Sequence, residues 1–376
     1  MQKYMYTSRG TLLAGIVFTL SLLPGSAHTQ DQEGAHPTLK NSFRAQEQSP
    51  NVFKGAFDPT VRRAIDQGLA YLVSRQNANG SWTNRVGYKL YDDYYGEEGD
   101  STDVTAIACM ALVSAGNVPG RGRYGGAVDK GINFLLSCVR DEDGYITKNG
   151  SRMYSHAFAT LFLAEIYGTT QRKDVKTKLK RAIQLLVSSQ NREGGWRYQP
   201  IPVDADLSVT VSTLQALRAA RNVGISVPIR TIEKAERYVK QCATRFGFTY
   251  QSATNYSFND TRISYALTAC GIVSLYSAGE YNSREIRDSL RALPRLRRRL
   301  IPGKLHFYYG HYYASQAMYL AGKEYWDQYY PRTKSDILRL QKPDGSWSDD
   351  VGRNYATAMA CVILQMSCEW LPIFQK

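Results

Sequence analysis

Three stretches of this chain share a glutamine, a glycine four positions later and a tryptophan six positions later: Gln76–Trp82 (QNANGSW), Gln190–Trp196 (QNREGGW) and Gln341–Trp347 (QKPDGSW). Glycine can turn the chain at the end of a helix because it adopts left-handed backbone angles at little cost. Glutamine can hydrogen-bond the exposed groups of a helix end, and tryptophan can pack against a neighbouring helix. The residues that define the three turns are Gln76, Gly80, Trp82, Gln190, Gly194, Trp196, Gln341, Gly345 and Trp347. Two shorter stretches, Asp143–Tyr145 and Phe246–Phe248, look like diverged copies.

The turns belong to a longer repeat in which a first helix, a glycine-containing turn and a second helix alternate. The first helices are expected to begin near Pro59, Gly125, Asp174, Pro228, Ser283 and Trp326. The second helices are expected to begin near Asp103, Tyr154, Asp206, Arg262, Gly310 and Asn354. Five second helices are expected to end at Gly116, Gly168, Gly224, Gly279 and Gly322, where glycine suits a helix C-cap.

The two sets of helices differ in polarity. Apolar residues recur three and four positions apart in the first helices, which carry Lys, Arg and Glu on their other face. The second helices are apolar almost all round, as in residues 106–113, and such helices are buried on every side. Six alternating pairs predict an all-α fold, an α/α toroid of about six helical hairpins with inner and outer rings, over residues 58–376.

The N-terminus has the pattern of a secretory signal. Lys3 and Arg9 precede an apolar run at 11–23, and small residues follow at 25–27. We predict a signal peptide over 1–27, with an uncleaved anchor as the alternative, then a polar linker without regular structure over 28–57. No later stretch is long and apolar enough to span a bilayer. The prediction is therefore an exported protein, periplasmic or extracellular.

The composition suggests partners. The formal net charge of +14 falls to +12 without residues 1–27, and much of the excess lies between Arg284 and Lys304. This basic stretch is either a solvated helix face or a contact for an anionic ligand or a membrane surface. No nucleic-acid motif accompanies it, so no nucleic-acid partner is expected. The six cysteines lack a framework spacing and are expected to be mostly buried thiols, with one bridge through Cys138, Cys242 or Cys368 left open. The oligomeric state is left open.

The Gln-to-Trp turns resemble the QW motif of the triterpene cyclases, such as squalene–hopene cyclase, and are similar to repeats of protein prenyltransferase β-subunits. The resemblance covers roughly residues 58–370. It implies an α/α toroid with active-site groups near the N-terminal ends of the inner helices. The cyclases carry Asp-x-Asp-Asp-Thr there, and Asp204–Ser208 (DADLS) keeps its first two acids, with Leu207 in place of the third. The resemblance implies that Asp206 is the acid that protonates a substrate alkene and that Asp204 assists it.

Two departures from those families are visible. The triterpene cyclases enclose their substrate between two toroid-like domains, whereas this sequence provides one. The prenyltransferases bind zinc through an Asp-x-Cys pair and a histidine, and only His311 has a counterpart here. We therefore expect neither a metal nor another cofactor.

The polar residues at the starts of the second helices indicate the same site, independently of the resemblance. If the second helices are inner and parallel, their N-termini meet at one mouth of the ring, where His156 and His311 could serve as acid or base beside the carboxylates. The predicted catalytic residues are Asp206, Asp204, His156 and His311. The predicted substrate-binding residues are Asp103, Tyr154, Asp260, Arg262, Tyr309 and Tyr355. Structural caps are the alternative for Asp103 and Asp206.

Three functions fit these patterns. The first is a terpenoid-cyclase-like protein that acts on or binds an isoprenoid or other lipid. The second is a non-catalytic module that binds a peptide, a lipid or an anionic glycan. The third is a polysaccharide-lyase-like enzyme, which would use Tyr154, His156, Arg262 and His311.

Overall fold

In the part of the chain that the structure describes, twelve α-helices are arranged as six hairpins within the compact unit Ser49–Lys376. A computed structural model describes residues 58–87, 96–252, 260–304, 306–368 and 371–374. The predicted signal peptide and linker lie outside the described residues. The outer helices are α3 (Pro59–Ser74), α5 (Gly125–Ser137), α7 (Lys173–Ser188), α9 (Ile229–Gln241), α11 (Arg284–Arg297) and α13 (Lys323–Arg339). The inner helices are α4 (Thr102–Ser114), α6 (Met153–Thr170), α8 (Leu207–Asn222), α10 (Tyr265–Ala278), α12 (Phe307–Ala321) and α14 (Arg353–Gln365).

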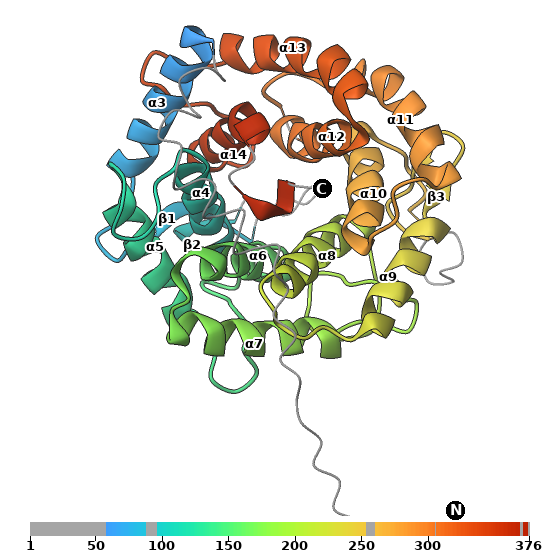
Figure 1. Ribbon diagram of the computed structural model, residues 1–376, viewed down its shortest axis with the longest axis horizontal. Coiled ribbons are helices and arrows are strands. Elements are labelled where there is room, and N and C mark those ends of the chain that lie inside the picture. Colours follow the sequence, from blue (N-terminus) through green and yellow to red (C-terminus); the bar gives the residue numbers. More distant parts are fainter. Residues whose placement is uncertain (1–57, 88–95, 253–259, 305, 369–370, 375–376) are drawn as a thin grey trace, which may run out of the picture. The chain divides into compact units, whose positions relative to one another are not determined.

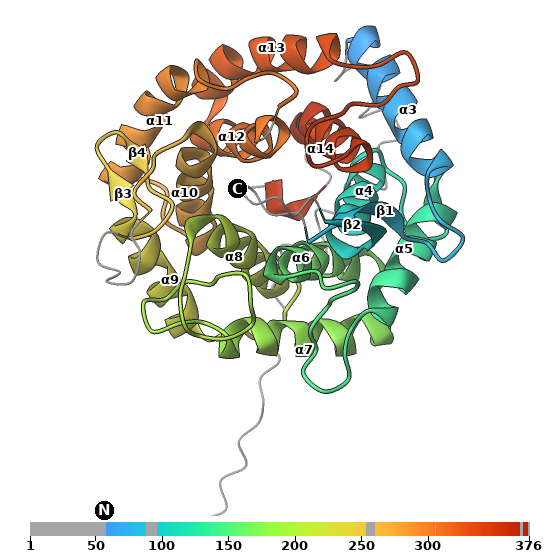
Figure 2. The same cartoon turned by 180° about the vertical axis from the view of Figure 1, so that it is seen from behind.

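The inner helices form a closed ring inside the outer ones (Figures 1 and 2). Each packs against the next in chain order, and α14 packs against α4, so the ring closes on itself. The predicted all-α toroid of six hairpins is therefore confirmed. Inner helices such as α4 bury nearly every side chain, whereas the outer helices bury one stripe, as their polarity predicts.

The Gln-to-Trp turns join each hairpin to the next one. Gln76 Nε2 donates to Gly80 O at 3.1 Å and to Ala127 O of the next outer helix at 2.8 Å. The indole of Trp82 donates to Leu72 O at 2.7 Å, and its backbone N–H donates to Thr105 Oγ1. The turns at Gln190 and Gln341 repeat this set of bonds. The sequence predicted the Trp packing but not that glutamine reaches across to the following hairpin.

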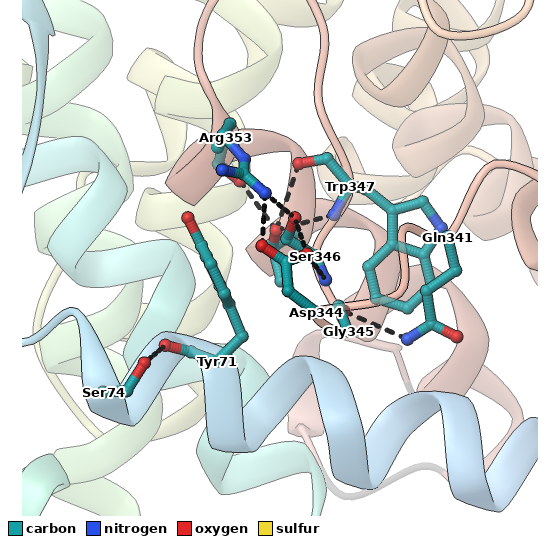
Figure 3. A network of polar contacts seen from close by, with 9 residues as sticks. Tyr71, Ser74, Gln341, Asp344, Gly345, Ser346, Trp347 and Arg353 are labelled. Atoms are coloured by element: carbon teal, nitrogen blue, oxygen red, sulfur yellow. Dashed lines mark hydrogen bonds and ion pairs between the residues drawn. The ribbon is translucent and has the colours of Figure 1, made fainter.

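The third turn closes the ring, because its next hairpin is the first one. Gln341 Nε2 donates to Ala64 O of α3 at 2.9 Å, and Gly345 lies so close to α3 that a Cβ would meet Gln67 O at 2.6 Å. Gly345 also has φ +83°, so two separate constraints require glycine here. Arg353 donates to Ser346 Oγ at 2.7 Å and stacks its guanidinium over the Tyr71 ring of α3 (Figure 3).

Two short β-hairpins lie in the loops that lead from outer to inner helices. Strand β1 (Trp82–Val86) pairs antiparallel with β2 (Glu97–Ser101), with Trp82 opposite Ser101. Strand β3 (Ala243–Thr244) pairs with β4 (Gly247–Phe248) in the same sense. The second hairpin contains one diverged turn, and the backbone N–H of Phe248 donates to Thr268 Oγ1 as the tryptophans do to their threonines.

A few predicted boundaries were wrong. Helix α6 continues past Gly168 to Thr170, and Gln171 adopts the left-handed conformation instead, at φ +51°. Helix α12 begins three residues before Gly310, at Phe307, and its N-cap is His306. All six cysteines are free thiols, five of them buried, so the open disulfide is not formed. Among the described residues, no helix combines the length and apolarity that a bilayer span requires.

The segment after α14 turns back into the ring. Residues 366–368 (η1, Met366–Cys368) and 372–374 (η2, Pro372–Phe374) are short 3₁₀ turns, and η2 packs against α8 near the ring centre (Figure 1). Leu371, Ile373 and Phe374 are at most 3% exposed. The amide of Ile373 donates to Glu165 Oε2 of α6 at 3.2 Å. The segment 371–374 therefore fills part of the ring that the sequence assigned to no element.

Replacing Glu165 with glutamine should flatten the dependence of stability on pH. Burial raises the pKa of Glu165 from 4.5 to about 8, so the folded state holds its proton more tightly than the unfolded chain. The stabilising contribution is then full below about pH 4.5 and is lost as the pH rises through about 8. Each pKa unit corresponds to about 1.4 kcal/mol, so the loss is on the order of a few kcal/mol. Denaturant unfolding across this interval should show the decline in the wild type and a flatter profile in Glu165→Gln. Equal slopes would contradict the assignment.

Candidate functional site

The loops from outer to inner helices form a continuous rim at one end of the ring. Hydrogen bonds join neighbouring loops: Asn149 Nδ2 to Asp100 O at 3.1 Å, Met153 N to Tyr198 O at 3.0 Å, and Leu207 N to Tyr250 O at 2.9 Å. Asn354 Nδ2 donates to Thr83 O at 2.8 Å and links the last loop to the first. The N-termini of the inner helices lie at this end. We call it the polar mouth, defined by the outer-to-inner loops and the first turn of each inner helix.

Asp206 is the most strongly constrained acid of the polar mouth. It is the N-cap of α8, it is 0% exposed, and its Oδ1 accepts a hydrogen bond from Val209 N at 2.9 Å. Its Oδ2 lies 3.7 Å from Arg197 Nε and has no hydrogen bond of good geometry within the described chain. Burial raises the pKa of Asp206 to about 6, although the Val209 amide, Arg197 and the Tyr250 hydroxyl oppose that rise. The carboxyl group can therefore hold a proton in mildly acidic solution.

Arg197 connects the two acids that the sequence singled out. Its Nη1 forms an ion pair with Asp204 Oδ2, while its Nε faces Asp206. Asp204 is therefore neutralised by an arginine and does not share a proton directly with Asp206. Arg197 therefore lies between the two carboxyl groups of the predicted catalytic pair, Asp206 and Asp204.

Tyrosine rings line the space next to Asp206. The hydroxyls of Tyr198 and Tyr250 hydrogen-bond each other, and the Tyr154 ring lies 6.3 Å from the Tyr198 ring. Arg262 stacks over Tyr250 at 4.8 Å and pairs with Asp260 at 3.2 Å. The structure thus brings the predicted Tyr154, Asp260 and Arg262 together with Asp206. Aromatic faces of this kind can stabilise a cation.

Deeper along the axis, side chains meet from inner helices that are not neighbours in the ring. Phe158 of α6 and Tyr312 of α12 have ring centroids 6.0 Å apart, and Gln215 of α8 donates to Gln316 of α12 at 2.5 Å. Tyr309 of α12 donates to Ser208 O of α8 at 3.4 Å, just below the mouth. The interior below the polar mouth is therefore largely occupied by the protein itself.

Across the mouth lies a second group of polar residues. Asp103 accepts a hydrogen bond from Ser101, the N-cap of α4, and Tyr355 is buried in the first turn of α14. Asp349, in the loop before α14, accepts from Val351 N at 2.9 Å through Oδ1, while its Oδ2 is buried and without a partner in the described chain. Burial raises the pKa of Asp349 to about 7.

The two predicted catalytic histidines point away from the mouth. His156 is fully buried; its Nδ1 accepts from Ile146 N at 3.0 Å and its Nε2 lies 3.2 Å from Ala182 O of α7. His156 accepts the backbone N–H of Ile146 in the diverged turn, just as Thr105 accepts the backbone N–H of Trp82 in the first turn. His156 therefore has the same structural role in its hairpin as Thr105 has. Burial lowers the pKa of His156 to about 4, which keeps the ring neutral. Both nitrogens face backbone groups, so we correct the prediction and remove His156 from the site.

His311 is likewise placed between the rings. Its Nδ1 lies 2.8 Å from the Tyr329 hydroxyl of α13 and 3.2 Å from the Tyr265 hydroxyl. Burial lowers the pKa of His311 well below its usual value. The start of α12 is marked instead by His306, which the sequence analysis did not select. His311 is therefore also removed from the site.

Arg197, Tyr198, Tyr250 and Asp349 belong to the polar mouth but were not predicted. Arg197 and Tyr198 directly follow Trp196, and Asp349 comes two residues after Trp347. The short distance in sequence from a turn tryptophan could have identified Arg197, Tyr198 and Asp349. Among the described residues, no cluster of three or more His, Cys, Asp or Glu side chains could hold a metal ion.

The chain is similar to a known protein over part of its sequence and to several solved structures in its fold. No family model matches it. Drimenyl diphosphate synthase of Streptantibioticus cattleyicolor is 26% identical over 178 residues, which cover 43% of this chain and 30% of that relative. The chain thus matches less than a third of that relative's length.

Solved structures show the fold over most of the chain. The type II terpene cyclase MstE from Scytonema, in complex with geranylgeranyl dihydroxybenzoate, has a TM-score of 0.56 at 13% identity, covering 84% of this chain and 98% of that chain. Cellobiose 2-epimerase from Spirochaeta thermophila has a TM-score of 0.61 at 13% identity, covering 83% and 98%. The chain has the α/α-toroid fold of the terpenoid cyclases. An inactive alpha-1,6-mannanase variant from Salegentibacter shares it too, at 9% identity and a TM-score of 0.58, over 81% and 97% of the two chains. The fold alone therefore does not decide the chemistry.

Proposed function

We propose that this protein is a terpenoid-cyclase-like enzyme that protonates an alkene of an isoprenoid or similar lipid at the polar mouth, with Asp206 as the acid. The observation that carries the proposal is the buried Asp206 carboxyl, whose pKa is raised to about 6 and whose Oδ2 has no hydrogen-bond partner in the described chain. The cyclase-like fold and the similarity of 178 residues, 43% of this chain and 30% of the relative, to a drimenyl diphosphate synthase support the substrate class.

The residues suggest a balanced proton cycle. The O–H bond of Asp206 breaks, the π electrons of the alkene form a new C–H bond, and a carbocation remains on the substrate. Arg197 stabilises the carboxylate left behind, and the faces of Tyr154, Tyr198 and Tyr250 stabilise the carbocation. Loss of a proton from a neighbouring carbon to water, and reprotonation of Asp206 by water, complete an isomerisation or a cyclisation with no oxidant or reductant.

The second candidate is binding without chemistry. The occupied ring axis favours it, because the contacts of Phe158 with Tyr312 and of Gln215 with Gln316, and the buried segment 371–374, leave less room for a long substrate than an open ring would. The lyase alternative depended on both histidines facing the mouth, and we do not propose it.

Conversion of the lipid should fall as the pH rises, because Asp206 must carry a proton to act as the acid. The full chain would be incubated with linear polyprenols and with squalene in detergent, over a pH series, and the extracts compared by gas chromatography and mass spectrometry. Conversion should be greatest below about pH 6 and decline above it, because Asp206 then loses its proton. Retention of an unchanged lipid at every pH would support the binding function instead. Neither retention nor conversion would contradict both.

A further inference from the structure

One sector of the rim exposes large apolar side chains. It consists of the three neighbouring loops that lead into α8, α10 and α12. Ile201 is 55% exposed, Val203 73%, Phe246 46% and Ile301 65%. Because inner helices α8, α10 and α12 are neighbours, these loops are neighbours as well.

The same sector carries arginines and lysines without acidic partners. Arg192, Arg245, Arg295, Arg298, Arg299 and Lys304 are exposed, and within the described chain none forms an ion pair. Three of the nearby acids are already engaged: Asp204 with Arg197, Asp260 with Arg262, and Asp336 with Arg297. Glu193, next to Arg192, is partly buried, and burial raises the pKa of its carboxyl. The guanidinium of Arg245 lies over the Phe246 ring at 4.5 Å, so charge and apolar surface alternate.

The opposite part of the rim has a different character. In the loops that lead into α4 and α6, the exposed acids Glu97, Glu98, Asp141 and Glu142 are mixed with the exposed bases Arg85, Arg140 and Lys148. The large apolar residues that are exposed in the described chain include none from these loops. The exposed large apolar side chains and the excess of bases over acids are therefore found in the three loops into α8, α10 and α12, and the opposite loops carry mixed charge.

We propose that this sector, which we call the basic-apolar sector, docks the protein onto an anionic lipid bilayer. Basic side chains are attracted to anionic headgroups, and exposed isoleucine, valine and phenylalanine side chains gain by entering the acyl boundary. An anionic glycan would match the charge but would leave the four apolar side chains in water. The bilayer is therefore the partner that both features fit.

Docking places the polar mouth against the membrane surface. The sector is continuous with the mouth through Arg197, Tyr250 and Arg262, which belong to the same loops. A lipid could then pass between the bilayer and the mouth without crossing water. The docking proposal does not depend on catalysis by Asp206.

The test uses a matched pair of labelled positions in the full chain. Ile301→Cys places an environment-sensitive fluorophore in the sector, and Ile229→Cys places it at the start of α9, at the opposite end of the hairpins, where the native residue is 56% exposed. Five native cysteines are buried, so labelling of the wild-type chain measures the background at the half-buried Cys368. The comparison of positions 301 and 229 reports which side of the protein faces the bilayer. Attachment to the vesicle through residues 1–27 alone would not produce a difference between these two positions.

With vesicles of phosphatidylcholine and phosphatidylglycerol, the emission at position 301 should shift to shorter wavelength and the emission at 229 should not. Pure phosphatidylcholine and added salt should both reduce the shift. Because each basic residue contributes about 1 kcal/mol near an anionic surface, Arg298→Glu with Arg299→Glu should raise the lipid concentration needed by at least about tenfold. Equal shifts at both positions, or no shift at 301, would overturn the proposal. Salt-sensitive retention on an anionic glycan without a lipid-induced shift at 301 would assign the sector to a glycan.

Discussion

Replacing Asp206 with serine should abolish conversion of the lipid substrate while leaving the fold intact. General acid catalysis contributes about 10²–10⁴-fold, and the other mouth acid with a raised pKa, Asp349, lies on the loop before α14 and not beside Tyr250. The serine can still cap α8, because serine does so elsewhere in the repeat. Ser101 caps α4 through Val104 N, and Ser264 caps α10 through Leu267 N at 3.1 Å. The Asp206→Ser variant therefore separates the acid from the cap.

The stability of Asp206→Ser supplies the control. The pKa of Asp206 is raised from 3.8 to about 6, so its stabilising contribution is full below about pH 3.8 and lost as the pH rises through about 6. At neutral pH the serine variant should be at least as stable as the wild type in denaturant unfolding. Asp206→Ala, which removes the cap, should lose about 1 kcal/mol. A serine variant that unfolds as easily as the alanine variant would mean that the carboxylate is needed for the fold.

Replacing Trp196 with alanine should destabilise the toroid by about 3–5 kcal/mol, the range for large aromatic side chains in cores. Trp196 is 1% exposed, and its indole donates to Leu186 O at 2.7 Å. The alanine variant leaves a cavity between α7 and α8 and removes the indole hydrogen bond to Leu186 O, which then keeps only Ser189 Oγ as a side-chain donor. The loss should appear as a lower midpoint in denaturant unfolding followed by circular dichroism.

Trp326→Ala is the matched control for this prediction. Trp326 lies in the outer helix α13, is only half-buried and stacks on Tyr330 with centroids 4.3 Å apart. Its removal should cost clearly less than the removal of Trp196. Equal losses would show that the turn tryptophans have no special part in joining the hairpins.

The repeat made the fold predictable. Helix starts near Pro59, Gly125 and Tyr154 lie within one residue of the observed ones, because the turn glycines and the apolar periodicity act locally. Those signals could not reveal that Gln76 reaches Ala127 or that the segment 371–374 fills the ring. Both depend on contacts between residues far apart in the chain.

The candidate site was predicted in part for a similar reason. Asp206 was found because its motif and its position at a helix start coincide. His156 satisfied the position but not the direction, since it lies one turn into α6 and faces Ala182 of the outer ring. Arg197 and Tyr250 enter the site through loops, whose paths the helical pattern does not specify. Sequence periodicity therefore located the mouth but not all of its lining.

The most direct measurement of the central claim follows the proton. The wild-type chain and Asp206→Ser would be incubated side by side with the converted lipid in deuterated water, and the products examined by mass spectrometry and NMR. We expect one deuterium on the carbon that was protonated in the wild-type product, and no product from Asp206→Ser. A product without deuterium at that carbon, or the same labelled product from the serine variant, would contradict it.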